Sequence, residues 1–357
     1  MDLDLRPFQP DWISPPGDTI ADLLEERGLT RTELAERTGF SAKHIDELVH
    51  GRGVISAETA LRLESVLGST ASFWLKREST YREKLARRAE EKAMTSEVGW
   101  LKELPMAQMR AFGWIPALRS RGAQVVSALR FFAVSSVEAW RARYEAPLAA
   151  FRTSKKLKPK PGAVAAWLRR GEIEGAAVRC EPWSPIGFRD VLPKLRALTT
   201  EPQPAKFLPV MKELCAKQGV ALVVVRAPGG CPASGATKFL SPEKALLILS
   251  FRHLADDHLW FSFFHEAGHL LKHGKKALFV EGIGMTSEEE NEADQFAREF
   301  LIPPDRNGEL AKLRSRQQIQ AFAAELGIAP GIVVGRLQHD HRLRRTELND
   351  LKVSYSW

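Results

Sequence analysis

The sequence predicts an α+β protein that is mostly α-helical, and three observations carry this prediction. Apolar residues recur at helical spacing through residues 18–75, short β-type runs are confined to residues 219–251, and a long apolar helical stretch follows at about 257–273. At 357 residues the chain is long enough for two to three domains with cores of their own. A hydrophobic content of 44% and a charged content of 27% exclude wholesale disorder.

The composition also limits where the protein acts. No apolar run reaches the roughly 18 residues that a membrane-spanning helix needs, and the acidic start MDLDLRPFQPDW lacks the features of a signal peptide. Three cysteines without a CxxC pair, Cys180, Cys215 and Cys231, exclude both a disulfide framework and a thiolate zinc site. We therefore expect a cytoplasmic protein with no membrane partner.

The net charge of +8 is unevenly distributed. Residues 1–75 hold 7 Lys and Arg against 13 Asp and Glu, a net charge of −6, whereas residues 76–160 hold 19 against 8, a net charge of +11. Nucleic-acid binding inferred from the overall basic character must therefore be assigned to the second segment or to a local patch.

A Pro-rich tail over residues 1–17 precedes a predicted module at 18–78 with five short helices. Ser41 is a suitable N-cap for the third helix, AKHIDELVHG, and Gly39 ends the helix before it. The fourth helix runs over about 57–67, and the fifth runs from Thr70 into Lys76. This spacing is typical of a helix-turn-helix.

A helix-turn-helix places its second helix in the major groove of double-stranded DNA. The residues expected to face bases or phosphates are Arg31, Ser41, Ala42, Lys43, His44, Glu47 and Arg52. A net charge of −6 opposes this binding, because affinity rises with the number of counterions that basic residues release. A homodimer would double the cationic patch, and the +11 segment could lie along the backbone of an operator. The alternative is that the module binds protein, as a dimerisation or repressor-docking unit.

Residues 79–204 predict a basic, mainly helical linking region. It begins with a mixed-charge helix, YREKLARRAEEKA, and is interrupted by the charged, Pro-containing stretch KKLKPKPG at 155–162. A further helix is expected at 163–170.

Residues 205–345 predict a second folded domain, followed by a C-terminal tail at 346–357. Its expected strands are GVALVVV (219–225), TKFL (237–240) and ALLILSF (245–251). Its expected helices lie at about 205–217, 257–273, 287–301, 315–326 and 329–338.

The strongest chemical signal is HEAGH at residues 265–269. His265 and His269 are just over one helical turn apart, so both imidazoles leave the same helix face and can bind one zinc ion. Glu266 lies beside them, where it can take a proton from the attacking water. This spacing is typical of a metallopeptidase.

A catalytic zinc site needs a third protein ligand, and the next helix, SEEENEADQFAREF, offers several. Glu290 can complete a His-His-Glu set, while Asp294, one turn later on the same face, can accept the outer N–H of a ligand histidine. Three other acidic residues are rival ligands: Glu288, Glu289 and Glu292. Iron or manganese would also suit such a set.

Three features near the motif have two interpretations each. The strand ALLILSF can offer a sheet edge to a substrate or be an ordinary core strand. His273 continues the histidine face but is surplus as a ligand, so we expect it to interact with the helix dipole. Arg336 or His339 in GRLQH can stabilise a tetrahedral intermediate, or serve packing or the surface.

Residues from about 205 to 340 resemble the ImmA/IrrE family of zinc-dependent endopeptidases through GVALVVV, WFSFFHEAGHLLKHG, ENEADQFAREFLIP and GIVVGRLQH. Residues 18–75 resemble the HTH-XRE class, and within it the HigA type of antitoxin. The resemblance implies a gluzincin-like fold with His265, His269 and Glu290 as Zn2+ ligands and Glu266 as general base. Members of the family cleave transcriptional repressors.

The favoured function is a zinc-dependent endopeptidase coupled to a helix-turn-helix domain, which acts in transcriptional regulation by cleaving a repressor or a toxin–antitoxin partner. One alternative is a non-catalytic, antitoxin-like repressor whose C-terminal domain senses metal, peptide or effector. Another is that the peptidase is the toxic component of a toxin–antitoxin module. The presence of Glu266 favours the enzyme, because a purely sensory metal site needs no general base.

Overall fold

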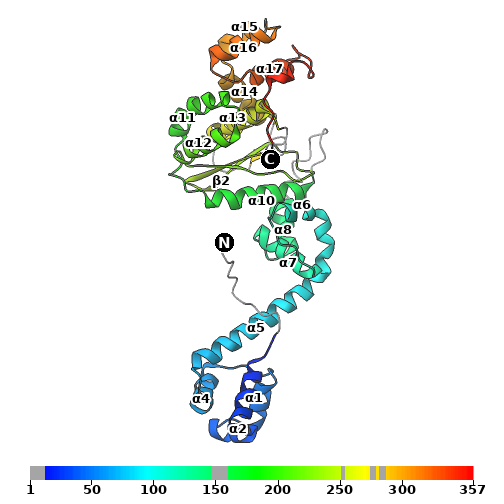
Figure 1. Ribbon diagram of the computed structural model, residues 1–357, viewed down its shortest axis with the longest axis vertical. Coiled ribbons are helices and arrows are strands. Elements are labelled where there is room, and N and C mark those ends of the chain that lie inside the picture. The colour runs from blue at the N-terminus through cyan, green and yellow to red at the C-terminus, as the bar shows by residue number, and fades with distance from the viewer. Residues whose placement is uncertain (1–12, 146–159, 251–253, 274–278, 281–286, 357) are drawn as a thin grey trace. The chain divides into compact units, whose positions relative to one another are not determined.

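The computed structural model describes residues 13–145, 160–250, 254–273, 279–280 and 287–356 (Figure 1). The chain forms two compact units, Met1–Ser96 with Ser120–Val126 and Glu97–Arg119 with Ser127–Trp357. Most of the predicted tail at 1–17 and of the predicted break at 155–162 lies outside the described residues. The predicted α+β, mostly α class is confirmed, because helices dominate the described chain and its strands form one small sheet.

The first unit contains the five helices that the sequence predicts. They are α1 (Pro16–Glu26), α2 (Arg31–Thr38), α3 (Ala42–Val49), α4 (Ala57–Leu67) and α5 (Ala71–Ala93). Thr30, Ser41 and Ser56 cap α2, α3 and α4, each accepting a backbone N–H three residues further on. Gly39 ends α2 in the left-handed conformation that glycine adopts without strain. The fully buried side chains of the core include Ile20, Leu34, Ile45, Leu63 and Trp74.

The fifth helix is longer than predicted. The expected helix from Thr70 into Lys76 and the mixed-charge helix YREKLARRAEEKA are one element, α5, because no Gly or Pro interrupts them. Two ion pairs with i,i+4 spacing, Glu78–Arg82 and Glu83–Arg87, support its length. The predicted boundary between residues 78 and 79 therefore falls inside a helix.

Short helical segments follow α5 in the chain: η1 (Met94–Glu103), α6 (Met106–Ala111), α7 (Arg121–Phe132), α8 (Val137–Trp140) and the π-helical η2 (Arg141–Glu145). Within the second unit, Trp100, Phe132 and Trp140 pack edge-on or tilted against one another and are buried. These aromatic rings supply the core of a region whose sequence shows little regular periodicity.

A four-stranded sheet with the order β1-β3-β2-β4 is the centre of the second unit. The strands are β1 (Val220–Val224), β2 (Gly235–Ser241), β3 (Lys244–Leu249) and β4 (Phe279–Val280). β3 pairs parallel with β1 and antiparallel with β2, and β2 also pairs antiparallel with β4. The three predicted strands are present. ALLILSF offers no free sheet edge, because β3 has a hydrogen-bonded strand on each side, so of its two predicted roles the core strand is correct.

Helices cover both faces of this sheet (Figure 1). On one face lies α10 (Pro161–Ala177), whose Gly171 and Gly175 approach Ile248 and Leu246 so closely that a Cβ would collide with them. On the other face, Leu247 belongs to the main apolar core together with residues of most of the later helices. Because α10 lies within the predicted linking region, part of that region packs on the sheet. The predicted division of the chain into five segments stays a prediction.

The remaining helices of the second unit carry the candidate site. They are α11 (Pro185–Ala197), η3 (Leu198–Thr200), α12 (Pro204–Ala216), α13 (Asp256–Lys272), α14 (Ser287–Leu301), η4 (Pro304–Arg306), α15 (Asn307–Leu310), α16 (Arg316–Leu326), α17 (Pro330–His339) and η5 (Asn349–Leu351). Five of them match the helices predicted after residue 204, and α11 was not predicted. Among the described residues no single helix is long and apolar enough to cross a membrane, although α16 and α17, bent by 114°, meet that test as a pair by length and composition alone.

Candidate metal centre

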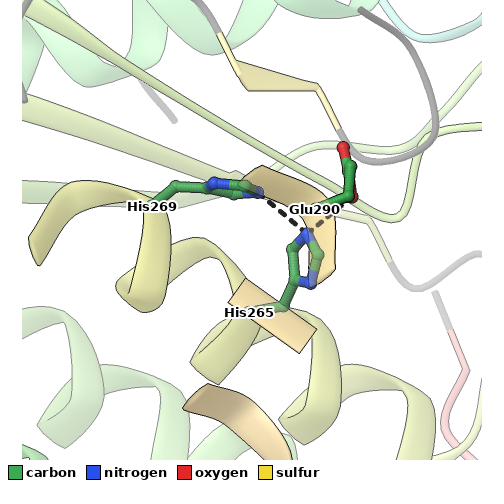
Figure 2. Close-up of side chains that lie close together, drawn as sticks. All are labelled: His265, His269 and Glu290. Atoms are coloured by element: carbon green, nitrogen blue, oxygen red, sulfur yellow. Dashed lines mark hydrogen bonds and ion pairs between the residues drawn. The ribbon is translucent and has the colours of Figure 1, made fainter. Parts of the chain in front are cut away.

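The HEAGH sequence lies in α13 and is buried. The side chains of His265, Glu266 and His269 are at most 1% exposed. The Nε2 atoms of His265 and His269 lie 3.0 Å apart, as expected for imidazoles that leave one helix face (Figure 2). Both nitrogens therefore converge on one point.

Helix α14 brings a carboxylate to the same point. Glu290 Oε2 lies 3.3 Å from His265 Nε2, and the candidate ligand atoms of His265, His269 and Glu290 all lie within 4.8 Å of one another (Figure 2). The other carboxylate oxygen, Glu290 Oε1, is buried and has no hydrogen-bond partner among the described residues. A buried acceptor without a donor beside two imidazole nitrogens fits a cation. Two imidazoles and a carboxylate are also the ligand types of catalytic zinc.

Close packing of α13 against α14 makes this convergence possible. A Cβ at Gly268 would lie 3.1 Å from Phe296 Cδ1 and 3.3 Å from Ala293 Cα, tighter than ordinary van der Waals contact. The two small residues Gly268 and Ala293 therefore allow the helix backbones to approach closely. As a result, the side chain of Glu290 reaches the histidines.

The outer nitrogen of His265 faces Asp294. His265 Nδ1 lies 3.0 Å from Asp294 Oδ1, and Arg298 donates to Asp294 Oδ2 at 3.2 Å. An ionised carboxylate only accepts hydrogen bonds, so this contact places the proton of His265 on Nδ1. Nε2 then keeps the lone pair that a metal requires.

The outer nitrogen of His269 faces a third histidine. His269 Nδ1 lies 2.9 Å from His273 Nδ1, and His273 Nε2 lies 2.9 Å from Glu292 Oε2. His273 is the C-cap of α13, the helix-end position that the sequence indicates. Its side chain also contacts His269 and Glu292. The predicted interaction with the helix dipole does not account for these two contacts.

The three rival acidic residues do not join the group of converging ligand atoms found among the described residues. Glu292 binds His273, and neither Glu288 nor Glu289 belongs to the group of three converging ligand atoms found among the described residues. Glu288 is exposed to solvent. The geometry therefore favours Glu290 among the acidic residues of this helix.

The electrostatic environment keeps one imidazole neutral. Burial, together with the neighbouring His265 and His273, lowers the pKa of His269 to about 3. The ring of His269 is therefore neutral near pH 7, with a proton on only one of its two nitrogens, and the other nitrogen is free of a proton that a metal would have to displace.

Glu266 lies against Gly235 of strand β2, a residue that the sequence did not single out. A Cβ at Gly235 would lie 2.5 Å from Glu266 Oε1 and 2.6 Å from Glu266 Cγ. Only glycine at this position leaves room for the Glu266 side chain. No local pattern marks Gly235, because the contact arises only when β2 packs under α13.

Arg336 and His339 of α17 line a cavity of about 270 Å³ between α13, α14 and α17. Neither residue belongs to the group of three ligand atoms. The side chain of His339 is 60% exposed, and its Nε2 lies 3.4 Å from the Arg298 guanidinium that also binds Asp294. The electrophilic role of His339 therefore stays a prediction. The apolar wall of the cavity consists of Phe261, Leu301, Ile302 and Ile332.

In the first unit, the residues predicted to contact DNA lie on and beside α3. Ser41 is its N-cap, Ala42 and Lys43 are exposed, and His44 and Glu47 are half-buried. Arg31 and Arg52 both bind one carboxylate, Asp46, at 2.9 Å each. The sequence did not single out Asp46, because this pairing depends on how α2 and the loop after α3 pack around α3.

Comparisons with known proteins match both ends of the chain. Residues 20–74 match the helix-turn-helix family, and residues 222–338 match the IrrE N-terminal-like domain. Antitoxin HigA-1 of Vibrio cholerae serotype O1 is 39% identical over 54 residues, which are 15% of this chain and 50% of that protein. The chain thus matches about half the length of this curated relative. A solved structure of an addiction module antidote protein of the HigA family from Coxiella burnetii is 27% identical, with 24% of this chain and 94% of that chain covered and a TM-score of 0.22.

Proposed function

We propose that this protein is a zinc-dependent endopeptidase that acts in transcriptional regulation. The proposal starts from the presence of an XRE-type helix-turn-helix domain and an IrrE-like peptidase domain in one chain. The observation that carries the proposal is the convergence of ligand atoms from His265, His269 and Glu290 within 4.8 Å of one another. The adjacent carboxylate of Glu266 adds the group that hydrolysis needs and that a sensory metal site does not.

In this proposal His265, His269 and Glu290 hold the metal, which when bound supplies a Lewis acid for the scissile carbonyl and for the attacking water. Glu266 takes the proton of that water and then donates it to the leaving amide nitrogen. Asp294 keeps the proton of His265 on Nδ1, 3.0 Å from its own Oδ1. Gly235 leaves the space in which the Glu266 side chain lies.

The test of the enzymatic function compares the zinc-loaded protein with its Glu266→Gln variant. Each is incubated with extract of the source cell, and new protein N-termini are identified by mass spectrometry. We expect one or a few new N-termini that appear with the parent and not with Glu266→Gln, while both proteins bind one zinc per chain. Equal cleavage by the two would remove Glu266 from the mechanism, and no cleavage by a zinc-loaded parent would favour the non-catalytic regulator.

The regulatory part of the proposal rests on the helix-turn-helix domain and on the similarity to a HigA antitoxin. We propose that this domain, as a homodimer, brings the peptidase to operator DNA or to a repressor bound there. The substrate would then be a repressor or a toxin–antitoxin partner. A growth assay tests whether the peptidase is instead a toxin, by comparing cells that produce the parent with cells that produce Glu266→Gln. Growth arrest by the parent alone would identify the peptidase as a toxin.

A second function of the first unit is favoured by one observation. Arg31 and Arg52 are both engaged by Asp46, and this leaves less positive charge for phosphates. This pairing favours binding of a protein partner over binding of DNA. Fluorescence anisotropy with a duplex from upstream of its own gene tests the choice, because a protein-docking module would show no salt-dependent binding.

A further inference from the structure

The two candidate ligand histidines are supported differently at their outer nitrogens. His265 contacts a carboxylate directly, through Asp294. His269 contacts another imidazole, His273, which in turn contacts the carboxylate of Glu292. A ligand histidine usually donates its outer N–H to a carboxylate, a carbonyl or water, so an imidazole in this position calls for an explanation.

We propose that His273 is a positioning residue that sets the tautomer and orientation of His269, and that Glu292 in turn sets the tautomer of His273. This inference rests on the metal centre proposed above. It concerns how that centre is assembled and adds no step to hydrolysis.

The positions of the protons follow from the contacts. His269 can bind a metal through Nε2 only if its proton is on Nδ1, which must then donate to His273 Nδ1 at 2.9 Å. His273 Nδ1 is consequently the acceptor, so the proton of His273 is on Nε2. That N–H donates to Glu292 Oε2 at 2.9 Å. Each step has one donor and one acceptor, and the sequence of contacts ends on a carboxylate that only accepts.

The same contacts argue against His273 as a metal ligand. Its Nδ1 is directed at the outer nitrogen of His269, and its Nε2 is directed at Glu292. The converging ligand atoms lie on the opposite side of the His269 ring, at Nε2. His273 therefore lies behind His269 and has no ring nitrogen directed at the candidate metal.

The surroundings of His273 and Glu292 favour a fixed orientation of the His273 ring. The His273 side chain is 7% exposed, and its ring packs on that of His269 with centroids 5.1 Å apart. Glu292 is 50% exposed, so the last acceptor lies at the surface. Glu292 also lies on the same helix as Glu290, so α14 supplies both a candidate ligand and the end of this chain of hydrogen bonds.

The experiment measures zinc affinity of the full chain by competition with a chromogenic chelator. His273→Phe keeps a ring but removes both nitrogens, and we expect zinc to bind about 10- to 100-fold more weakly. His273→Gln keeps one acceptor and one donor at the same position, so it should restore most of the affinity. The midpoint of thermal unfolding of the zinc-free protein should be similar in both variants.

A matched pair of surface variants tests the last contact without disturbing the core. Glu292→Ala should weaken zinc binding, whereas Glu288→Ala, the same charge change at an exposed site of the same helix, should leave it unchanged. Equal losses in the two would mean that net charge alone acts, and would overturn the proposal. The visible spectrum of the cobalt-substituted His273→Phe protein should match that of the parent, and an altered spectrum would instead make His273 a ligand.

Failure of this inference is distinguishable from failure of the proposed function. If the parent binds zinc and both His273→Phe and Glu292→Ala bind it equally well, the positioning role is wrong and the metal centre stands. If the parent binds no zinc, the metal centre itself is wrong.

Discussion

Gly235 lies against Glu266 with no space for a side chain between them. A Cβ at Gly235 would stand 2.5 Å from Glu266 Oε1 and 2.9 Å from Glu266 Cδ. Glu266 is fully buried, so its carboxylate cannot yield by turning into solvent. The first residue of β2 thus determines where the proposed general base can lie.

The first prediction follows from this contact. Gly235→Ala should displace the Glu266 carboxylate and lower kcat by at least about tenfold, because a displacement near 1 Å of a catalytic group has effects of this order or larger. The measurement uses an internally quenched peptide selected from a library by cleavage with the parent. Zinc content should stay at the parent value, because Gly235 contacts the proposed base and is not one of the converging ligands.

Gly229→Ala is the matched control for that variant. Gly229 has only ordinary contacts, the nearest at 3.5 Å to Gln108, so a Cβ fits there without displacement. Parent-like turnover by Gly235→Ala would show that the position of Glu266 in this structure does not matter for the chemistry.

The second prediction concerns the third ligand. Elemental analysis of the purified chain should give about one zinc per chain for the parent and a sharp loss for Glu290→Ala, because two imidazoles alone leave the site one protein ligand short. Glu288→Ala should keep its zinc, since this exposed side chain is not among the converging ligand atoms. If the two variants lose zinc equally, Glu290 has no special place in the site.

The third prediction concerns Asp46. Asp46→Asn should release Arg31 and Arg52 from their 2.9 Å ion pairs and raise affinity for a random-sequence duplex by about tenfold in low salt. The plot of log affinity against log salt should become steeper by about 1 to 2, one for each guanidinium that gains a phosphate. Fluorescence anisotropy at several salt concentrations measures both quantities.

Glu25→Gln serves as the control for Asp46→Asn, because it changes the charge equally at an exposed site on α1. An equal gain in affinity would assign the effect to net charge. No binding by either variant would support the protein-docking function of the module.

The fourth prediction is a pH dependence of stability that originates at Asp256. This side chain is 1% exposed at the start of α13, and burial raises its pKa to about 6. The hydrogen bond from the Asp257 backbone N–H opposes this rise in pKa, the negative charge of Asp257 adds to it, and the positive charge of Lys352 opposes it. In the unfolded chain the pKa is about 3.9. Between these values the folded protein holds more protons than the unfolded chain, so the free energy of unfolding falls as pH rises from about 4 to about 6.

Asp256→Asn should remove this decline, because the amide does not ionise. The contribution of Asp256 amounts to at most about 3 kcal/mol between the two pH limits. Urea unfolding at pH 5 and pH 7.5 should show that the variant gains stability relative to the parent as pH rises. Asp257→Asn should instead destabilise the fold, because Lys352 Nζ donates to Asp257 Oδ2 at 2.6 Å and would lose its partner. A parent whose stability is the same at both pH values would contradict the assignment.

Much of the secondary structure could be predicted because its signals are local. The helix caps at Thr30 and Ser41 and the apolar spacing within each helix depend on residues only a few positions apart. The same holds for the short apolar runs that form β1 and β3. Helix α11, which was not predicted, begins at Pro185 and contains Pro193. Proline is locally a helix breaker, so the signal near these residues does not favour a helix.

The sequence alone also determined that His265 and His269 share a helix face, because a spacing of four residues is a property of the helix itself. It could not decide among the acidic residues of α14. Gly268 and Ala293 set how closely the two helices approach, and that approach brings Glu290 to the histidines, Asp294 behind His265 and Glu292 to His273. In the same way, only the packing of β2 under α13 places Gly235 against Glu266. The spacing of residues within one helix or strand follows directly from the sequence. Contacts between elements depend in addition on the distance and rotation at which those elements pack.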